Sequence, residues 1–118
     1  MTVALTRLPQ LSRAEFQGYW LEQHGPLVRR LAEVLGIVEY VQLHALDEAP
    51  SEAASGHARW TAPYDGLAEI WYASREDFDG RMAAPATQDA AALLRADELR
   101  FIDRRNSPRW WGMERRIL

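Results

Sequence analysis

The sequence predicts an α+β domain in which helices cover one face of an antiparallel four-stranded sheet. Three observations support this fold class. Runs rich in β-branched and aromatic residues alternate in polarity with a period of two, as strands do. Segments between these runs carry apolar residues at three- and four-residue spacing, as helices do. The chain of 118 residues, 47% of them hydrophobic, has the length and composition of one domain with one core.

The first strand and the first helix follow one another near the N-terminus. Residues 2–8 (TVALTRL) are rich in β-branched and aliphatic types and predict the strand. Ser12 and Glu15 have the S-x-x-E spacing of a capping box, which predicts a helix from about residue 13. Gly36 is the predicted stop. The expected buried stripe comprises Phe16, Tyr19, Trp20, Leu27, Leu31 and Val34 or Leu35.

Two further strands flank a long connection. Residues 37–46 (IVEYVQLHAL) and 66–73 (GLAEIWYA) alternate with period two and predict the second and third strands. Residues 47–63 are rich in Pro, Ser, Gly and Ala without a sustained period, which predicts a long loop. Loops of this length are often functional, so this one is expected to help select a ligand.

The last third of the chain predicts further helices and the closing strand. Ser74 is positioned to cap a second helix, Pro85 to end it and Thr87 to begin another segment. Residues 110–118 (WWGMERRIL) alternate in polarity and predict the closing strand. The turn DELRFID before it is expected to bury two apolar side chains, Leu99 and Phe101.

The elements occur in the order β-α-β-β-α-β, which is the ferredoxin-like βαββαβ arrangement with the helices on one face of the sheet. The other face then needs a cover. In a chain this short the simplest cover is the same face of a second copy, related by a two-fold axis. We therefore predict a homodimer, with Trp71 and Trp110 among its buried anchors.

Composition excludes several classes of function. A formal charge of −3 and a pI near 5.6 give no overall positive field, so no nucleic-acid partner is expected. The absence of Cys removes disulfides, thiolate nucleophiles and cysteine metal sites. All 14 basic residues are Arg, which removes lysine Schiff-base and pyridoxal chemistry. No signal-like N-terminus or membrane-length apolar run is present, so we expect a cytoplasmic protein without a membrane partner.

Several motifs together resemble the EthD-like family of the dimeric α+β-barrel superfamily. They are LSRAEFQGYWLEQHGPLV in the first helix, VEYVQLH in the second strand, YDGLAEIWYAS entering the third, and DELRFID. The resemblance covers most of the chain and implies ferredoxin-like subunits paired sheet to sheet in a homodimeric α+β barrel, with a pocket beside the histidine-bearing helix. It implies no single reaction, because members look like cofactor-free cyclases, isomerases, decarboxylases and oxygenases of aromatic or polyketide-type compounds, and others degrade haem.

His24 is the first candidate for a catalytic residue. It lies four residues after Trp20 on the predicted buried stripe. Pro26 has no N–H for the carbonyl four residues earlier, which opens the helix, and Gly25 permits close approach. Histidine changes charge near neutral pH, as a general base requires. The alternative is a core histidine hydrogen-bonded to a strand carbonyl.

Three other residues are candidates for acid–base roles. Glu69 and Glu114 lie mid-strand among apolar neighbours, where burial favours the neutral acid, so that either is a candidate to act as an acid or to orient His24. The alternative for both is an ion pair with Arg7, Arg115 or Arg116. Tyr40 offers a hydroxyl that stabilises an enolate oxygen, with strand packing as its alternative.

The candidates for ligand contact are mostly aromatic, with core packing or a turn as their alternative. They are Trp20, Trp60, Tyr64, Asp65, Trp71 and Tyr72. Asp65 with Gly66 is first of all typical of a turn. His44 and His57 lack H-x-x-x-H or H-E-x-x-H spacing, so no metal is expected.

The sequence therefore predicts an acid–base enzyme without an organic cofactor that acts on a small hydrophobic, aromatic or polyketide-like carbonyl metabolite. His24 moves a proton beside the carbonyl, and Glu69 or Tyr40 holds the imidazole or the enolate. Cyclisation, isomerisation and decarboxylation all contain that step. One alternative is a non-catalytic protein that binds a hydrophobic ligand or serves an oxygenase pathway. Another is haem binding or monooxygenase chemistry.

Overall fold

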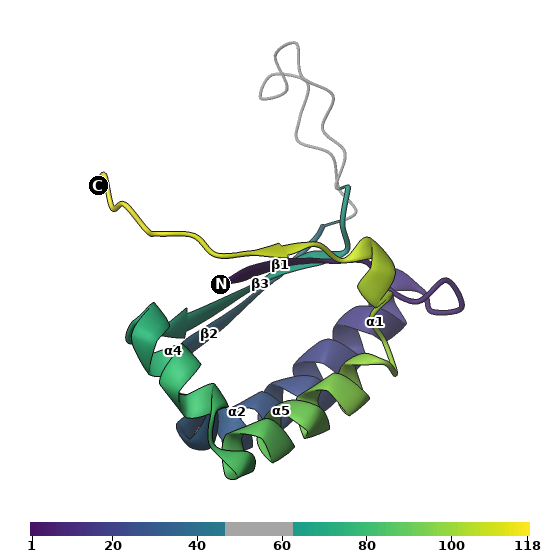
Figure 1. The fold of residues 1–118 in the computed structure, drawn as a ribbon. Helices are drawn as coiled ribbons and strands as arrows, with labels where there is room; N and C mark the ends of the chain where they lie inside the picture. The colour runs from purple at the N-terminus through teal and green to yellow at the C-terminus, as the bar shows by residue number, and fades with distance from the viewer. Residues whose placement is uncertain (47–62) are drawn as a thin grey trace.

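The computed structural model describes residues 1–46 and 63–118, which form a four-stranded antiparallel sheet with the helices on one face (Figure 1). This is the predicted fold class. The strands lie in the order β2-β3-β1-β4. Their bounds are Thr2–Leu5 for β1, Ile37–His44 for β2, Gly66–Tyr72 for β3 and Arg109–Trp110 for β4. All but the last residue of the predicted loop, 47–63, lies outside the described residues.

The predicted first helix is three helical segments in succession: α1 (Arg13–Tyr19), the π-helix η1 (Trp20–His24) and α2 (Gly25–Leu35). The capping box forms as predicted, since Ser12 Oγ accepts from the Glu15 amide and the Glu15 carboxylate accepts from the Ser12 amide. The π turn precedes Pro26, which has no N–H to continue the α pattern. The predicted opening of the helix beside the histidine is therefore present.

Two glycines of this region have different surroundings, one after the end of α2 and one at its start. Gly36 follows α2 in the left-handed region with φ of 70°, as the predicted stop requires. At Gly25 a Cβ atom would meet nothing nearer than Gln42 Nε2 at 3.5 Å. The prediction that backbone approaches Gly25 closely is therefore wrong, because only ordinary contacts surround it, whereas a close approach by a ligand stays a prediction.

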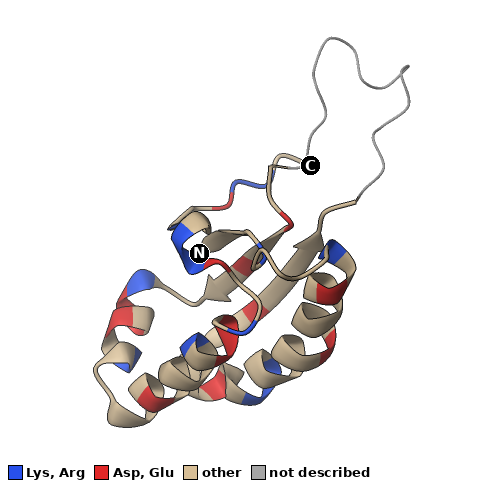
Figure 2. Cartoon of the chain, turned by 90° about the vertical axis from the view of Figure 1, so that its right-hand side faces the viewer, with Lys and Arg blue, Asp and Glu red and all other residues tan. Residues whose placement is uncertain are grey.

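The C-terminal helices are α4 (Arg75–Met82), α5 (Pro85–Glu98) and the 3-10 turn η2 (Arg104–Asn106). Ser74 caps α4 as predicted, accepting from the Asp77 amide at 3.0 Å. Pro85 is the first residue of α5, a position where its missing N–H costs nothing, so α5 begins before Thr87. Acidic and basic residues are interspersed along the helices (Figure 2).

Two expectations for the C-terminal region are wrong. Leu99 is 61% exposed, and only Phe101 of the predicted pair is buried. The closing strand contains only Arg109 and Trp110, and the exposed residues after Trp110 form no strand. Trp110 pairs with Thr2, and Trp111 then turns to pack its ring 5.0 Å from that of Phe78.

The strand registers show which residues lie on each face of the sheet. Val3 pairs with Ala68 and with Arg109, and this row faces the helices. Thr2 pairs with Glu69 and with Trp110, and this row faces away. The core between the inner face and the helices is formed by Leu5, Phe16, Trp20, Ala68, Phe101 and Ile102. Within the described residues, no helix combines the length and apolar character needed to cross a bilayer.

Candidate functional site

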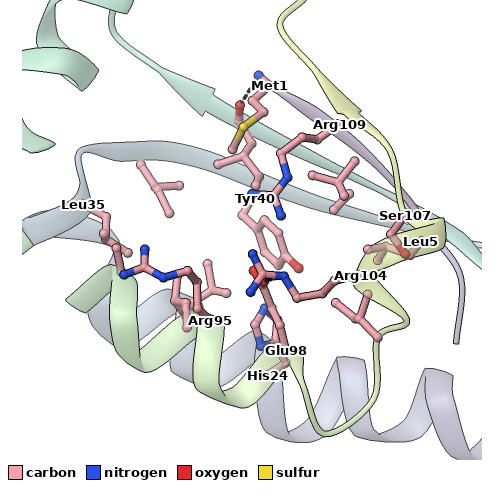
Figure 3. A pocket seen from close by; sticks show the side chains of 18 of the residues that line it. Met1, Leu5, His24, Leu35, Tyr40, Arg95, Glu98, Arg104, Ser107 and Arg109 are labelled. Carbon is pink, nitrogen blue, oxygen red and sulfur yellow. Dashed lines mark hydrogen bonds and ion pairs between the residues drawn. The ribbon is translucent and has the colours of Figure 1, made fainter. Parts of the chain in front are cut away.

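A cavity of about 170 Å³ lies between the inner face of the sheet and helices α2, α4 and α5. Its walls are mainly aliphatic and aromatic. An engineered apolar cavity of about 150 Å³ binds benzene, so this volume suits an aromatic ring. The polar side chains that reach it are His24, Tyr40, Tyr72, Arg95, Glu98, Arg104, Ser107 and Arg109 (Figure 3).

His24 lies on one wall of this cavity and is only 5% exposed. Its Nδ1 lies 2.8 Å from Oδ2 of Asp97 on α5. The other oxygen of Asp97 accepts from the Tyr19 hydroxyl at 2.6 Å. The imidazole also packs against Phe101, with the ring centroids 5.1 Å apart. His24 is therefore a buried histidine as the alternative expected, but its partner is a helix carboxylate and not a strand carbonyl.

Asp97 determines which nitrogen of His24 is available for chemistry. An ionised carboxylate only accepts hydrogen bonds, so the neutral imidazole carries its proton on Nδ1. Nε2 has no hydrogen-bond partner among the described residues, and those residues contain no buried side-chain nitrogen or oxygen without a partner. Nε2 therefore keeps some accessible surface on a residue that lines the cavity, with its lone pair free to take a proton.

Tyr40 presents a hydroxyl to the same cavity. Its oxygen accepts from the Trp20 indole N–H at 2.8 Å and from the Gln42 amide at 3.5 Å. Burial raises the pKa of Tyr40, and the hydrogen bonds from Trp20 and Gln42 oppose this rise. The hydroxyl thus keeps its proton, and both protein contacts use its oxygen as acceptor. Its O–H is available to donate to a ligand.

Glu69 does not join His24. It lies in the outward row of β3 that pairs with Thr2 and Val41, whereas its neighbours Ala68 and Ile70 line the cavity. The sheet therefore separates Glu69 from the imidazole, and the prediction that it orients His24 is wrong within one chain. Asp97 occupies that role instead.

The structure also places Glu114 away from the cavity. It was expected mid-strand, but it lies in the exposed segment after β4. The pairing expected between Glu69 and Arg7 is likewise not formed, because Arg7 pairs with Asp65.

Asp65 is a structural anchor rather than a lining residue of the cavity. It is 4% exposed and accepts from the Arg7 backbone N–H at 2.9 Å, from the Arg7 guanidinium and from Arg13 Nε at 3.2 Å. Burial raises the pKa of Asp65, but the hydrogen bonds from Arg7 and Arg13 outweigh it and hold that pKa below its ordinary value. The residue ties the start of β3 to β1 and α1.

The predicted aromatic residues separate into two groups. Trp20 and Tyr72 line the cavity, and burial raises the pKa of Tyr72 to about 12. Trp71 lies on the outward face and pairs with Glu39, and Tyr64 lies outside the cavity lining. Two candidates, Trp60 and His57, lie outside the described residues.

His44 has a packing role. Its ring stacks on Trp20 with centroids 4.5 Å apart, and its Nε2 contacts the Gln42 side-chain oxygen at 2.9 Å. Burial lowers the pKa of His44. Over the part of the chain that the structure describes, no three His, Cys, Asp or Glu side chains gather as metal ligands.

Asp97 and the cavity arginines were not among the predicted site residues. Asp97 lies within the DELRFID motif, 73 positions from its histidine partner. A capping or periodic pattern gives no sign of such a contact, because it depends on how α5 packs beside the helix of His24. The motif itself was the signal available in the sequence.

Three known proteins are similar to this chain. The dehydratase ustZ of Ustilaginoidea virens is 27% identical over 104 residues, which cover 86% of this chain and 72% of that protein. A crystal structure of an EthD family protein from Bacillus halodurans C-125 has a TM-score of 0.51 at 16% identity, covering 86% of this chain and 84% of that one. HapK from Hahella chejuensis gives 0.46 at 16% identity, over 98% of each chain.

The family assignment rests on the sequence match. The family model described as the EthD domain aligns with residues 8–105, a range that includes His24, Tyr40 and Asp97. The Bacillus structure agrees at the level of the fold. With the family model matching most of the chain, this protein belongs to the EthD domain family.

Proposed function

We propose that this protein is an acid–base enzyme that removes a proton beside the carbonyl of a small aromatic or polyketide-like metabolite, with dehydration as the overall reaction. The observation that carries the proposal is the His24–Asp97 pair on the wall of an apolar cavity, with Nδ1 held at 2.8 Å by the carboxylate and Nε2 left without a partner among the described residues. A base held in one tautomer and partly removed from water has the arrangement used in general base catalysis.

The proposed step uses two side chains. Nε2 of His24 takes the proton from the carbon next to the carbonyl, and the electron pair moves onto the carbonyl oxygen. The Tyr40 O–H donates a hydrogen bond to that developing enolate. The enolate then expels the hydroxyl group on the next carbon. The imidazolium returns its proton to that hydroxyl, so one water leaves and His24 is neutral again.

Dehydration is preferred among the reactions that pass through an enolate because the relative from Ustilaginoidea virens is named a dehydratase. Cyclisation, isomerisation and decarboxylation remain in the same proposal, since each passes through an enolate that Tyr40 is positioned to stabilise. The aromatic substrate class is supported by the cavity, whose wall includes Trp20, Tyr72 and Phe78.

The test measures the proton transfer itself. A panel of aryl ketones is screened by thermal melting, because a ligand that binds the folded state raises its stability. Each ketone that binds is then incubated with the protein in deuterated water, and exchange of the hydrogens beside the carbonyl is followed by mass spectrometry. We expect His24→Gln to slow this exchange by about 10²- to 10⁴-fold, the usual range for a general base.

The matched control is His44→Gln, which replaces a histidine outside the cavity lining and is expected to leave exchange within a few-fold of wild type. Thermal melts of both variants establish that they are folded. A ketone that binds wild type but exchanges no faster than in buffer contradicts the proposal and favours a carrier that does not change its ligand.

A further inference from the structure

The cavity carries more positive than negative charge. Its lining includes three arginines, Arg95, Arg104 and Arg109, and Glu98 is the one carboxylate among the described residues that line it. Glu98 pairs with Arg104 at 3.5 Å. Within residues 1–46 and 63–118, Arg95 and Arg109 form no ion pair or hydrogen bond. Both residues are exposed, so water solvates their guanidinium groups, and where they line the cavity their N–H donors are available to an anionic ligand.

Two of these arginines are directed at the reacting end of the cavity. Arg109 pairs across the sheet with Val3, a lining residue, so the register of β4 turns its side chain inward. Arg104 reaches in from η2. Both side chains extend toward Tyr40 and Glu98 (Figure 3). Arg95 points along the cavity and adds to the positive charge.

We propose that Arg104 and Arg109 bind a carboxylate group of the ligand, so that the substrate is an aromatic carboxylic acid. The guanidinium fork matches the planar carboxylate in a two-bond contact. A phosphate fits the fork too, but the Glu98 carboxylate pairs with Arg104 in the same lining and repels a dianion more strongly than a singly charged carboxylate. This inference names the substrate class for the function proposed above and rests on the same cavity.

The test compares three small probes of one size class by isothermal titration. Cinnamate carries the carboxylate, cinnamamide has the same shape without charge, and phenyl phosphate carries the competing anion. We expect wild type to bind cinnamate about tenfold or more tightly than cinnamamide, which is the factor for one charge-assisted hydrogen bond. Raising the salt concentration should reduce this preference.

Substitutions of the cavity arginines test which side chains bind the carboxylate. Arg109→Gln and Arg104→Gln are each expected to remove most of the preference for cinnamate while leaving cinnamamide binding unchanged. Because Arg104→Gln leaves Glu98 unpaired, Arg104→Gln combined with Glu98→Gln is measured as well. Arg30→Gln on α2 is the matched control, since Arg30 is exposed like Arg109 but does not line the cavity.

Several outcomes overturn the inference: equal affinity for cinnamate and cinnamamide, an unchanged preference in Arg109→Gln, tighter binding of phenyl phosphate than of cinnamate, or no binding of any probe up to its solubility limit. The deuterium exchange of neutral aryl ketones tests His24 separately. Exchange without charge preference removes only the carboxylate inference, whereas charge preference without exchange removes only the proposed catalysis.

Discussion

Asp97 is placed to fix the orientation and tautomer of His24 without touching the ligand. Asn at this position keeps the size, but its amide can donate as well as accept, so the imidazole is no longer held with the proton on Nδ1. We expect Asp97→Asn to slow ketone proton exchange by about 10²- to 10⁴-fold while the ketone affinity changes little. A purely structural role would lower affinity and stability together.

The readout specific to this role is the nitrogen NMR spectrum of the His24 ring, which distinguishes Nδ1–H from Nε2–H. In Asp97→Asn we expect the spectrum to show more of the tautomer with the proton on Nε2. Tyr19→Phe is the control, because it removes the 2.6 Å hydrogen bond to Asp97 and leaves the contact with His24. An unchanged spectrum in Asp97→Asn would exclude the positioning role.

Asp65 makes stability depend on pH in the acid range. Its pKa is lowered in the folded protein, since the hydrogen bonds from Arg7 and Arg13 outweigh burial. The unfolded chain therefore binds a proton first as pH falls, so this stability is present above about pH 3.9 and is lost as pH falls through the folded pKa. We expect Asp65→Asn to cost about 1–3 kcal/mol at pH 7, and less at pH 3.

Urea denaturation at pH 7 and pH 3 measures this difference. Asp79→Asn is the control, because its ion pair with Arg75 is exposed and such pairs contribute little. Equal losses at both pH values for Asp65→Asn would show that the charge of Asp65 is not the source of its contribution.

At the scale of the elements, β3 begins with a glycine because Trp20 packs against it. A Cβ at Gly66 would lie 2.5 Å from Trp20 Cζ3 and 2.8 Å from the Leu43 carbonyl oxygen. The backbone of β2 cannot give way easily, so Trp20 must move and weaken its bond to Tyr40. We expect Gly66→Ala to destabilise the fold by about 1–3 kcal/mol, the usual cost of overpacking.

The control for Gly66→Ala is Gly25→Ala. A Cβ there meets only ordinary contacts within a helical stretch, so stability is expected to stay equal or rise by up to about 1 kcal/mol. Chemical denaturation of both variants tests this difference. A Gly66→Ala protein as stable as wild type would mean that Trp20 repacks without loss.

Features that depend on neighbouring residues in the chain could be predicted from the sequence. Features that depend on contacts with distant segments could not. The capping box at Ser12 and the stop at Gly36 depend on a few neighbouring residues, and both are present. The length of β4 depends on its partner β1, and the polarity pattern of residues 110–118 contains no information about where that pairing ends. The exposure of Leu99 likewise follows from how α5 ends.

At the scale of the whole molecule, the site is assembled from segments far apart in the chain. His24 and Tyr40 were predicted because residue type and strand alternation identify them. Asp97 was not, because nothing in the spacing of the chain brings α5 beside the first helix. Glu69 was assigned to the wrong partner because alternation places residues on one of two faces without saying which face the helices cover.

The outward face of the sheet supports the last prediction, a homodimer. Its row of Trp110, Thr2, Glu69 and Val41 continues with exposed Leu43, and Leu43 and Trp110 are 62% and 48% exposed. The helices cover only the opposite face (Figure 1). We propose that the same face of a second copy covers these apolar side chains around a two-fold axis, since a self-complementary contact satisfies both copies at once.

Light scattering and analytical ultracentrifugation at micromolar concentration test this proposal. Wild type is expected to sediment as a dimer, and Val41→Glu with Leu43→Glu to give a folded monomer, because four like charges would face one another at the interface. Leu93→Glu on α5 is the matched control, since this residue is also exposed but lies on a helix rather than on the sheet. A monomeric wild type would contradict the homodimer, and a double variant that still forms a dimer would show that the interface lies elsewhere. Because each chain contains its own His24, Asp97 and cavity, we expect ketone exchange to survive in the monomer.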